Sequence, residues 1–222
     1  MEEHIVRIES ITPVTHNVKQ FRLTKPPGYK FEPGQATEIS INKNEWKEKR
    51  NPFTFTSLNS WPYLEFTIKI YPERNGVTNE LGKLNPGDEL ILHDVWGAIA
   101  YKGEGYFIAG GAGITPFIAI LRQLNSDNLI KTNQLFFSNR TADDIILHKE
   151  LDAILGANAH YIITNEKTGT FENGHINKEY LISHVTDFSK PFYVCGPDKM
   201  VSDLSQVLSA LGASADQVVF EK

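Results

Sequence analysis

Cysteine is nearly absent from this sequence, because Cys195 is the single one among 222 residues. One thiol excludes a disulfide within the chain, and it excludes an iron–sulfur cluster held by four thiolates of this chain. The seven histidines show no H-x-x-x-H spacing typical of metal ligands, so we predict no metal site. A run of about 18 consecutive apolar residues is also lacking, and we therefore expect no membrane-spanning helix.

Positive charge is not in excess either. The chain has 22 lysines and arginines against 27 aspartates and glutamates, a formal net charge of −5, which disfavours a nucleic-acid-binding surface. The first residues are acidic and lack the basic-then-apolar pattern of a signal peptide, so we expect a cytoplasmic protein. Basic side chains do gather in one segment, either a solvated loop or a contact for an anion or an acidic partner: Lys43, Lys47, Lys49 and Arg50.

The first half of the chain has the pattern of an antiparallel β domain. Up to about residue 103, short β-branched or alternating runs are separated by turns rich in proline and glycine, which is typical of a closed barrel or a sandwich. The expected strands are His4–Glu9, Asn17–Leu23, Ala36–Ile41, Phe53–Ser57, Leu64–Tyr71 and Glu89–His93.

From residue 105 onward strands alternate with helices, which predicts an α/β domain with a parallel, Rossmann-like sheet. The expected strands are Phe107–Ala109, Gln134–Phe137, Ala159–Thr164 and Phe192–Cys195. The expected helices are Thr115–Leu124, Leu147–Leu155, Lys178–His184 and Asp198–Leu211. We therefore predict two domains, a β-barrel over residues 1–103 and a Rossmann-like domain over residues 104–222.

A glycine-rich turn, Gly-Gly-Ala-Gly-Ile-Thr-Pro-Phe, occupies residues 110–117 between an expected strand and an expected helix. Gly111 and Gly113 can adopt backbone angles closed to other residues and let a ligand approach closely. Thr115 is expected to cap the helix, and Pro116 suits its first turn. The free amides would then face an anion such as a dinucleotide phosphate. Because Pro116 stands where G-x-G-x-x-G has its last glycine, a tight turn without a nucleotide is the alternative.

Three further segments accompany this turn. Residues 50–57 read Arg-Asn-Pro-Phe-Thr-Phe-Thr-Ser, residues 76–78 read Gly-Val-Thr, and residues 195–200 read Cys-Gly-Pro-Asp-Lys-Met. In order and spacing, the four segments resemble the flavin and nucleotide motifs of the ferredoxin–NADP reductase-like superfamily. The resemblance covers essentially the whole chain and implies a flavin-binding barrel followed by a nucleotide domain, with FAD and NAD(P)H as cofactors. Taken alone, residues 53–56 would favour an ordinary amphipathic strand; the three accompanying segments favour the flavin motif.

The resemblance also implies roles for residues of the barrel. Thr54 would hydrogen-bond the flavin N5 edge, where hydride arrives, and Phe53 would lie against the ring system. Gly76, Val77 and Thr78 would hold the pyrophosphate at the start of a short helix, which favours FAD over FMN. The other residues expected to contact the flavin are Arg50, Asn51, Ser57 and the backbone of Ile68, Lys69 and Ile70.

Two positions depart from the family pattern. Asn51, not Arg50, stands at the usual arginine position, so either a one-residue shift lets Arg50 reach the pyrophosphate or that contact is missing. Phe53 replaces the usual tyrosine, which keeps the ring packing and loses the hydroxyl. A charge-assisted hydrogen bond contributes about 1.5–3 kcal/mol, so we expect a flavin that is partly lost on purification.

In the second half, Cys195 stands where the family places a cysteine beside the nicotinamide. It would shape the pocket so that the nicotinamide C4 approaches the flavin N5 to about 3–3.5 Å. A buried structural cysteine is the alternative. The resemblance extends to its neighbours in the same segment, Gly196, Pro197 and Met200.

Two more sites bear on the nicotinamide nucleotide. Ser138 and Arg140 follow the second strand of the domain and would hold a 2′-phosphate, a slight preference for NADPH. Alternatively, Arg140 pairs with Asp143 and Asp144. Glu221 resembles a glutamate that ends the last strand of some reductases, where it contacts the nicotinamide or relays a proton; a solvated carboxylate is as consistent.

These features predict a flavin-dependent NAD(P)H oxidoreductase, with Thr54, Cys195 and Glu221 as its catalytic residues. The chain has no cysteine cluster and no haem motif, so the electron acceptor would be a separate molecule, with ferredoxin, flavodoxin, another subunit, quinone and oxygen all open. The basic loop favours an acidic carrier protein. The alternatives are a non-catalytic electron-transfer or regulatory subunit and a flavin-free nucleotide-binding module.

Overall fold

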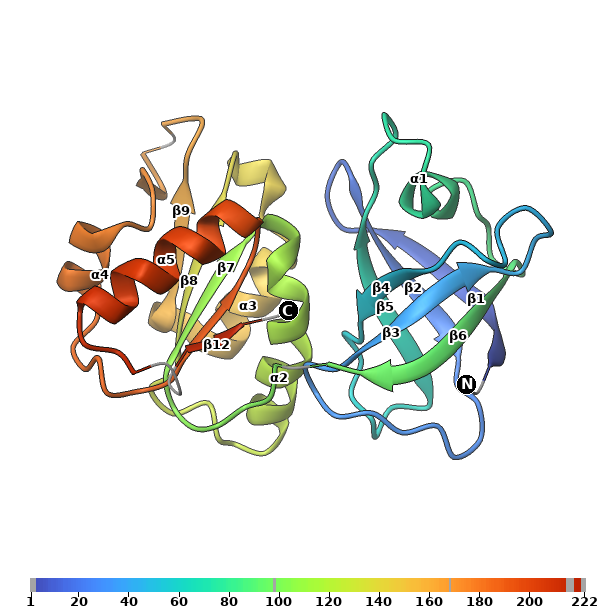
Figure 1. Ribbon diagram of the computed structural model, residues 1–222, viewed down its shortest axis with the longest axis horizontal. Helices are drawn as coiled ribbons and strands as arrows, with labels where there is room; N and C mark the ends of the chain where they lie inside the picture. Colours follow the sequence, from blue (N-terminus) through green and yellow to red (C-terminus); the bar gives the residue numbers. More distant parts are fainter. Residues whose placement is uncertain (1–2, 98, 168, 215–217, 221–222) are drawn as a thin grey trace.

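The computed structural model describes residues 3–97, 99–167, 169–214 and 218–220. The first half forms a six-stranded antiparallel sheet in the order β4-β3-β6-β1-β2-β5 (Figure 1). Its strands are β1 (His4–Pro13), β2 (Val18–Thr24), β3 (Ala36–Ile41), β4 (Asn51–Thr54), β5 (Tyr63–Lys69) and β6 (Glu89–Trp96). An antiparallel bridge from Phe55 to Phe66 joins the chain after β4 to β5, so the two edges of the sheet meet. This closure confirms the barrel and rules out the sandwich.

Alternation of apolar and polar side chains explains the barrel strands. In β2, Phe21 and Leu23 are fully buried, whereas Arg22 and Thr24 between and beyond them are exposed. Phe66 of β5 packs on the same core, in contact with Phe55 at a ring-centroid distance of 4.8 Å. A short helix, α1 (Val77–Leu81), lies between β5 and β6 and buries Val77 and Leu81 in that core.

The second half forms a six-stranded parallel sheet in the order β10-β9-β8-β7-β11-β12. Its strands are β7 (Tyr106–Gly110), β8 (Gln134–Asn139), β9 (Ala159–Ile163), β10 (Glu172–Asn173), β11 (Phe192–Cys195) and β12 (Val218–Phe220). Its helices are α2 (Thr115–Ser126), α3 (His148–Leu155), α4 (Lys178–His184) and α5 (Asp198–Ala210).

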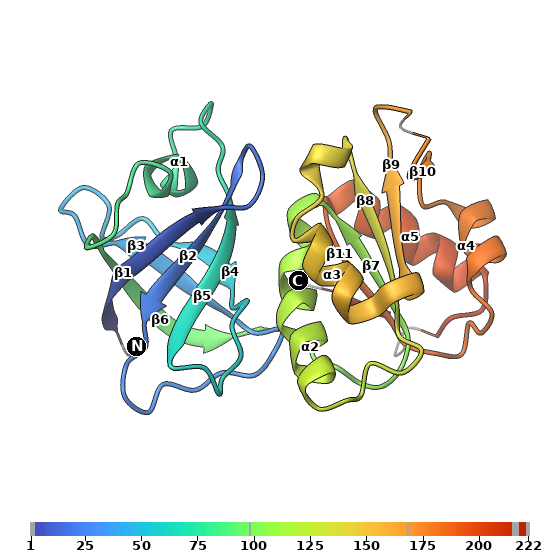
Figure 2. The same cartoon turned by 180° about the vertical axis from the view of Figure 1, so that it is seen from behind.

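Helices cover both faces of this parallel sheet. α4 and α5 lie in front of the sheet in Figure 1, and α2 and α3 lie in front of it in Figure 2. Two apolar clusters fill the layers, one with Phe117 of α2 and Leu151 of α3, the other with Leu181 of α4 and Leu204 of α5. The chain is therefore a barrel followed by a three-layer α/β domain, as predicted, and α2 is the helix nearest the barrel in both views.

Most expected elements occur within one to four residues of their predicted bounds, and Ala36–Ile41, Lys178–His184 and Phe192–Cys195 match fully. The strand expected over Phe53–Ser57 is wrong at its end, because β4 stops at Thr54 and the chain turns toward β5. The two-residue β10 was not expected. The domain boundary at residue 103 stays a prediction; β6 ends at Trp96 and β7 begins at Tyr106. Within the described ranges, every helix is too short or too polar to cross a membrane.

Candidate functional site

The carboxyl ends of β7, β8 and β11 meet at one edge of the parallel sheet. Gly110 of β7 pairs with Ser138 of β8, and Ala109 of β7 pairs with Cys195 of β11. From β7 the chain continues to β8 on one side and later returns to β11 on the other, so strand order reverses at β7. In open α/β sheets, ligands bind outside the carboxyl ends of the strands at such a reversal.

The glycine turn occupies this reversal point. Residues Gly111–Ile114 form a 3₁₀ turn between β7 and α2, and Gly111 has a φ of +52°, which glycine adopts without strain. No atom of the described residues lies within 4 Å of a Cβ built at Gly111, so they leave this side of the turn open. A Cβ at Gly113, by contrast, would overlap the carbonyl oxygen of Cys195 and lie 2.6 Å from the amide nitrogen of Gly196. Gly113 therefore serves close packing of two loops.

Thr115 does not cap α2 as expected. It is the first residue of the helix, and its hydroxyl donates to the carbonyl oxygen of Ala112 at 3.0 Å, which closes the preceding 3₁₀ turn. The N-cap position belongs to Ile114, which has no side-chain acceptor. The first amides of α2 are consequently not satisfied by a side-chain cap. Pro116 lies in the first turn, as predicted.

The segment after β11 lies against the glycine turn. Cys195 is 6% exposed and packs in the apolar layer under α2, while its backbone contacts Gly113. A Cβ at Gly110 would lie 2.5 Å from the sulfur of Met200, so the segment Gly196–Met200 covers the end of β7. Pro197 is exposed and directly precedes α5. The position of Cys195 beside the nicotinamide stays a prediction.

Arg140 follows β8 and is exposed, and Ser138 of β8 is half-buried. Within the described part of the chain, no ion pair joins Arg140 to Asp143 or Asp144. Asp144 instead accepts hydrogen bonds from the amide and the hydroxyl of Thr141. The guanidinium of Arg140 is thus available to a ligand at the end of β8.

On the barrel, Asn51 and Phe53 are half-buried on β4, and Thr54 is 7% exposed. Phe53 packs, partly buried, against the barrel core. Among the described residues, no hydrogen bond engages the hydroxyl of Thr54. The flavin contacts of these three residues stay predictions.

Two expected flavin contacts have other partners. Ser57 is fully buried, and its hydroxyl accepts a hydrogen bond from the amide of Glu65 at 3.0 Å, so we assign it to holding the β4–β5 hairpin. Arg50 donates to Glu3 at 3.2 Å and lies 3.9 Å from Glu38. Arg50 lies just before β4. Its two carboxylate partners favour the alternative in which the pyrophosphate contact is missing, and the one-residue shift stays a prediction.

The start of α1 remains compatible with a pyrophosphate. Gly76 is its N-cap residue, and in the described part of the chain no atom lies within 4 Å of a Cβ built there. Val77 is buried and anchors the helix, and Thr78 is half-buried beside it. The adjoining backbone is that of the end of β5, where Ile68 is buried and Lys69 is half-buried, and of Ile70, which follows β5. Ile70 is buried, and its amide donates to the Asn17 carbonyl.

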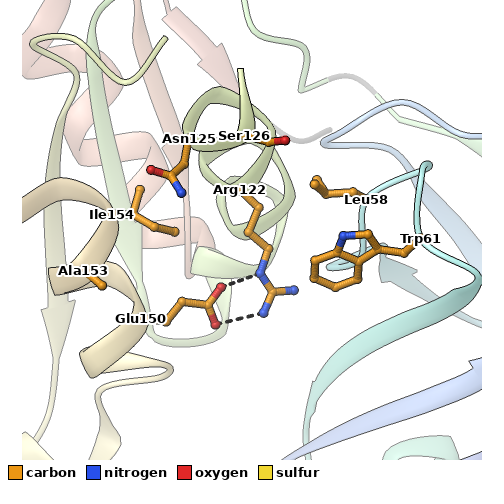
Figure 3. A pocket seen from close by; sticks show the side chains of 8 residues that line it. All are labelled: Leu58, Trp61, Arg122, Asn125, Ser126, Glu150, Ala153 and Ile154. Atoms are coloured by element: carbon orange, nitrogen blue, oxygen red, sulfur yellow. Dashed lines mark hydrogen bonds and ion pairs between the residues drawn. The ribbon is translucent and has the colours of Figure 1, made fainter. Parts of the chain in front are cut away.

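A buried ion-pair network joins the two domains. Arg122 of α2 is 9% exposed and donates to the Thr56 carbonyl and the Glu65 carboxylate of the barrel, each at 2.6 Å. It also forms a two-bond pair with Glu150 of α3, at 2.5 and 2.9 Å (Figure 3). Burial alone would lower the pKa of Arg122, but Glu150 and Glu65 outweigh it and raise the pKa, so the side chain stays charged.

A cavity of about 410 Å³ opens beside this network. The guanidinium of Arg122 faces Trp61 across it, 5.1 Å from the ring centroid (Figure 3). The other lining residues are Leu58, Asn125, Ser126, Glu150, Ala153 and Ile154. The lining contains none of the residues assigned to cofactors, so we assign this region to domain contact.

The residues of the nucleotide domain match a known family model. Residues 107–206 match the family described as the oxidoreductase NAD-binding domain. NADH-cytochrome b5 reductase 1 of Eremothecium gossypii is 30% identical over 231 residues, an alignment covering 95% of this chain and 80% of that protein. The chain belongs to the ferredoxin–NADP reductase-like family of flavin oxidoreductases.

One further relative and one solved structure agree with this family assignment. The reductase component of propane 2-monooxygenase from Rhodococcus jostii is 27% identical, over 97% of this chain and 62% of that protein. A ferredoxin NADP⁺ reductase from Neisseria gonorrhoeae, solved with bound FAD and NADP, has the same fold with a TM-score of 0.88. It is 20% identical, and the match covers 100% of this chain and 98% of that one. The chain is thus a flavin-dependent NAD(P)H oxidoreductase.

Sequence patterns missed several residues of the reductase. Gly110 was not assigned, although it packs closely against Met200 and Pro197; its place as first residue of the Gly-Gly-Ala-Gly turn was the available signal. Arg122 gave no signal, because its partners Glu65 and Thr56 are far away in sequence. Glu221 lies outside the described residues.

Proposed function

We propose that the reductase binds NAD(P)H at the carboxyl ends of β7, β8 and β11 and FAD on β4, β5 and α1, and that it passes electrons to a separate protein acceptor. The observation that carries this proposal is the packing of Gly113 against Cys195 and Gly196, which joins the two nucleotide loops into one surface. The open space at Gly111 and at Gly76 leaves room for two phosphate groups, one in each domain. The residues present therefore fit both cofactors.

When bound, the two cofactors supply hydride transfer and the division of an electron pair into single electrons. The chain's own residues bind and orient. The free hydroxyl of Thr54 serves as a hydrogen-bonding group for the flavin N5 edge. The buried Cys195 forms the wall of the nicotinamide pocket and excludes water from it. The exposed Arg140 supplies a cation for a 2′-phosphate.

For the acceptor, we favour an acidic carrier protein such as ferredoxin or flavodoxin. The basic loop, residues 43–50, supports this choice of acceptor. Fewer of its positive charges are unpaired than the sequence suggests. Lys43 lies 3.7 Å from Asp88, Arg50 pairs with Glu3, and Lys49 lies 4.1 Å from the ring centroid of Trp46. Lys47 is exposed. A carrier would therefore meet a patch of moderate positive charge, and its binding should weaken only modestly with salt.

The nucleotide role of Arg140 is tested by anaerobic titration of the FAD-loaded protein with NADPH or NADH. Wild type should bleach with both, with the lower KM for NADPH. Arg140→Gln should raise the KM for NADPH about tenfold, because one charge-assisted contact worth about 1.4 kcal/mol is lost. The KM for NADH should change less than about twofold, because NADH lacks the 2′-phosphate.

The exposed Lys131 provides a matched control, and Lys131→Gln should leave both KM values unchanged. Equal increases in the KM values for NADH and NADPH in Arg140→Gln would contradict the 2′-phosphate role. A bound flavin that neither nucleotide bleaches would instead favour a non-catalytic electron-transfer or regulatory subunit. A chain that cannot be loaded with FAD would favour a flavin-free nucleotide-binding module.

Asn51→Arg should tighten FAD binding ten- to a hundredfold. An arginine at this position of β4 supplies the charge-assisted hydrogen bond that the chain lacks, worth about 1.5–3 kcal/mol. The measurement is the FAD dissociation constant of the apoprotein, from quenching of FAD fluorescence. Arg50→Gln is the matched control and should change the constant less than about threefold, because Arg50 is engaged with Glu3 and Glu38. The reverse pattern would show that Arg50 reaches the pyrophosphate.

A further inference from the structure

Three possible metal ligands meet at the edge of the parallel sheet, although they are widely spaced in sequence. His160 lies on β9, Glu172 on β10 and His184 in the last turn of α4. One ligand atom from each lies within 4.8 Å of the others. The three elements lie on the side of the molecule away from the barrel (Figure 2).

The two imidazoles contact different oxygens of one carboxylate. His160 Nδ1 lies 3.4 Å from Glu172 Oε1, and His184 Nε2 lies 3.5 Å from Glu172 Oε2. In a tetrahedral zinc site with bonds of about 2.0–2.1 Å, neighbouring ligand atoms stand about 3.4 Å apart. The observed spacings therefore fit a shared ion after small side-chain rotations.

The ring of His184 is already oriented as a ligand. Its Nδ1 lies 2.9 Å from both the carbonyl oxygen of Tyr180 and the hydroxyl oxygen of Ser183, and its Nε2 faces Glu172. In the tautomer with the proton on Nδ1, this nitrogen donates to the Tyr180 carbonyl and Nε2 keeps its lone pair for a metal. In a metal-binding histidine, the ring nitrogen that does not bind the metal usually donates a hydrogen bond, often to a backbone carbonyl, and this bond fixes the ring. The ring also stacks on Tyr180 at a centroid distance of 4.0 Å, which limits its rotation.

Burial and charge suit a bound cation. The side chains of His160, Glu172 and His184 are 25%, 40% and 27% exposed, so the group is partly shielded yet open to a fourth ligand. His184 lies at the carboxyl end of α4, where the helix dipole favours positive charge. Two nitrogens and one carboxylate are typical zinc ligands.

We propose that His160, Glu172 and His184 bind one Zn²⁺ ion, with water as the fourth ligand. The ion would tie β10 and α4 to β9. The site is separate from the nucleotide loops, because His160 lies in the amino-terminal half of β9 and those loops follow the carboxyl ends of the strands. Without an ion, the same groups would form two histidine–carboxylate pairs, which is the competing account.

The test titrates untagged, chelator-treated protein with ZnCl₂ and follows binding by calorimetry and stability by thermal melting. We expect one Zn²⁺ per chain. At a free concentration of about 100 times Kd, the melting midpoint should rise by about 5–10 °C. His184→Gln and Glu172→Gln should each weaken Zn²⁺ binding at least about tenfold, as loss of one of three ligands requires.

His148→Gln is the matched control, because His148 is 36% exposed and pairs with Asp152 outside this cluster. Its Zn²⁺ affinity should equal that of wild type. Melting curves without zinc show whether each variant is folded, and Glu172→Asp, which keeps a carboxylate, should recover part of the affinity. The proposal is overturned if wild type binds no Zn²⁺, or if it binds equally well in His184→Gln and Glu172→Gln. Failure of NAD(P)H oxidation would leave this result untouched, since binding is measured directly.

Discussion

Gly113→Ala is expected to lower kcat/KM for NAD(P)H by about a hundredfold, because a displacement of about 1 Å in a positioning element can cost that much. The added methyl would overlap the carbonyl of Cys195 and press on the amide of Gly196. Both obstacles are backbone, so neither can rotate away, and the glycine turn must separate from the segment after β11. When these two segments separate, both the phosphate-binding amides of the glycine turn and Cys195 are displaced. Stopped-flow measurement of anaerobic flavin reduction gives the rate and the nucleotide dependence.

Gly156→Ala is the control for this substitution. Gly156 lies just before β9, at the amino-terminal edge of the sheet and away from the nucleotide loops, and no described atom lies within 4 Å of the new methyl group. Its φ of +56° means that the alanine costs some stability without displacing those loops. We expect its flavin reduction rate to stay within about twofold of wild type. Circular dichroism of both variants separates local displacement from loss of the fold. A folded Gly113→Ala protein with normal kcat/KM would show that the loops can separate without harm.

Arg122→Met should reduce the free energy of unfolding by about 3–5 kcal/mol, the usual cost of removing one partner of a buried ion pair. The substitution leaves Glu65 buried in the barrel without its cation and leaves the Thr56 carbonyl without a donor. Glu150, which is more exposed, loses its two hydrogen bonds at smaller cost. Urea unfolding followed by tryptophan fluorescence measures the change, and Trp61 beside Arg122 reports on the junction itself.

The partner substitution Glu65→Gln isolates the pair. If the loss arises from the unpaired carboxylate, the double variant should be more stable than the sum of the two single losses predicts, by at least about 1 kcal/mol. Lys83→Ala removes an exposed pair with Glu80 and should cost less than about 0.5 kcal/mol. Additive losses in the double variant would mean that the junction depends on packing rather than on charge.

Hydrophobic pattern was sufficient for most of the fold. Strands such as Ala36–Ile41 and helices such as Lys178–His184 have a clear period, and local propensity and burial favour the same structure there. The predicted end of β4 was wrong because of a tertiary contact. Phe55 continues the apolar pattern but pairs with Phe66 across the barrel closure, and a bridge between distant residues has no local sequence signal.

The candidate site, too, was predictable only where its geometry is local. The order of strand, glycine turn and helix predicted the positions of Gly111 and Gly113, because backbone geometry is local. Side-chain partners are not local. Ser57 bonds to Glu65, and His160, Glu172 and His184 lie twelve residues apart along the chain. Spacing rules that search within one helix or one turn therefore gave no indication of the zinc site proposed here.

The turn between β1 and β2 reaches beyond its own domain. Val18, at the start of β2, is 2% exposed and belongs to the apolar cluster beneath α2, and His16 lies 3.8 Å from Asp144 across the junction. A piece of the barrel thus completes the core of the nucleotide domain. If two relatives were recombined with a single crossover at residue 103, residue 18 would come from a different parent than the rest of the core in which it packs. Viable chimeras must inherit residues 14–18 from the same parent as α2.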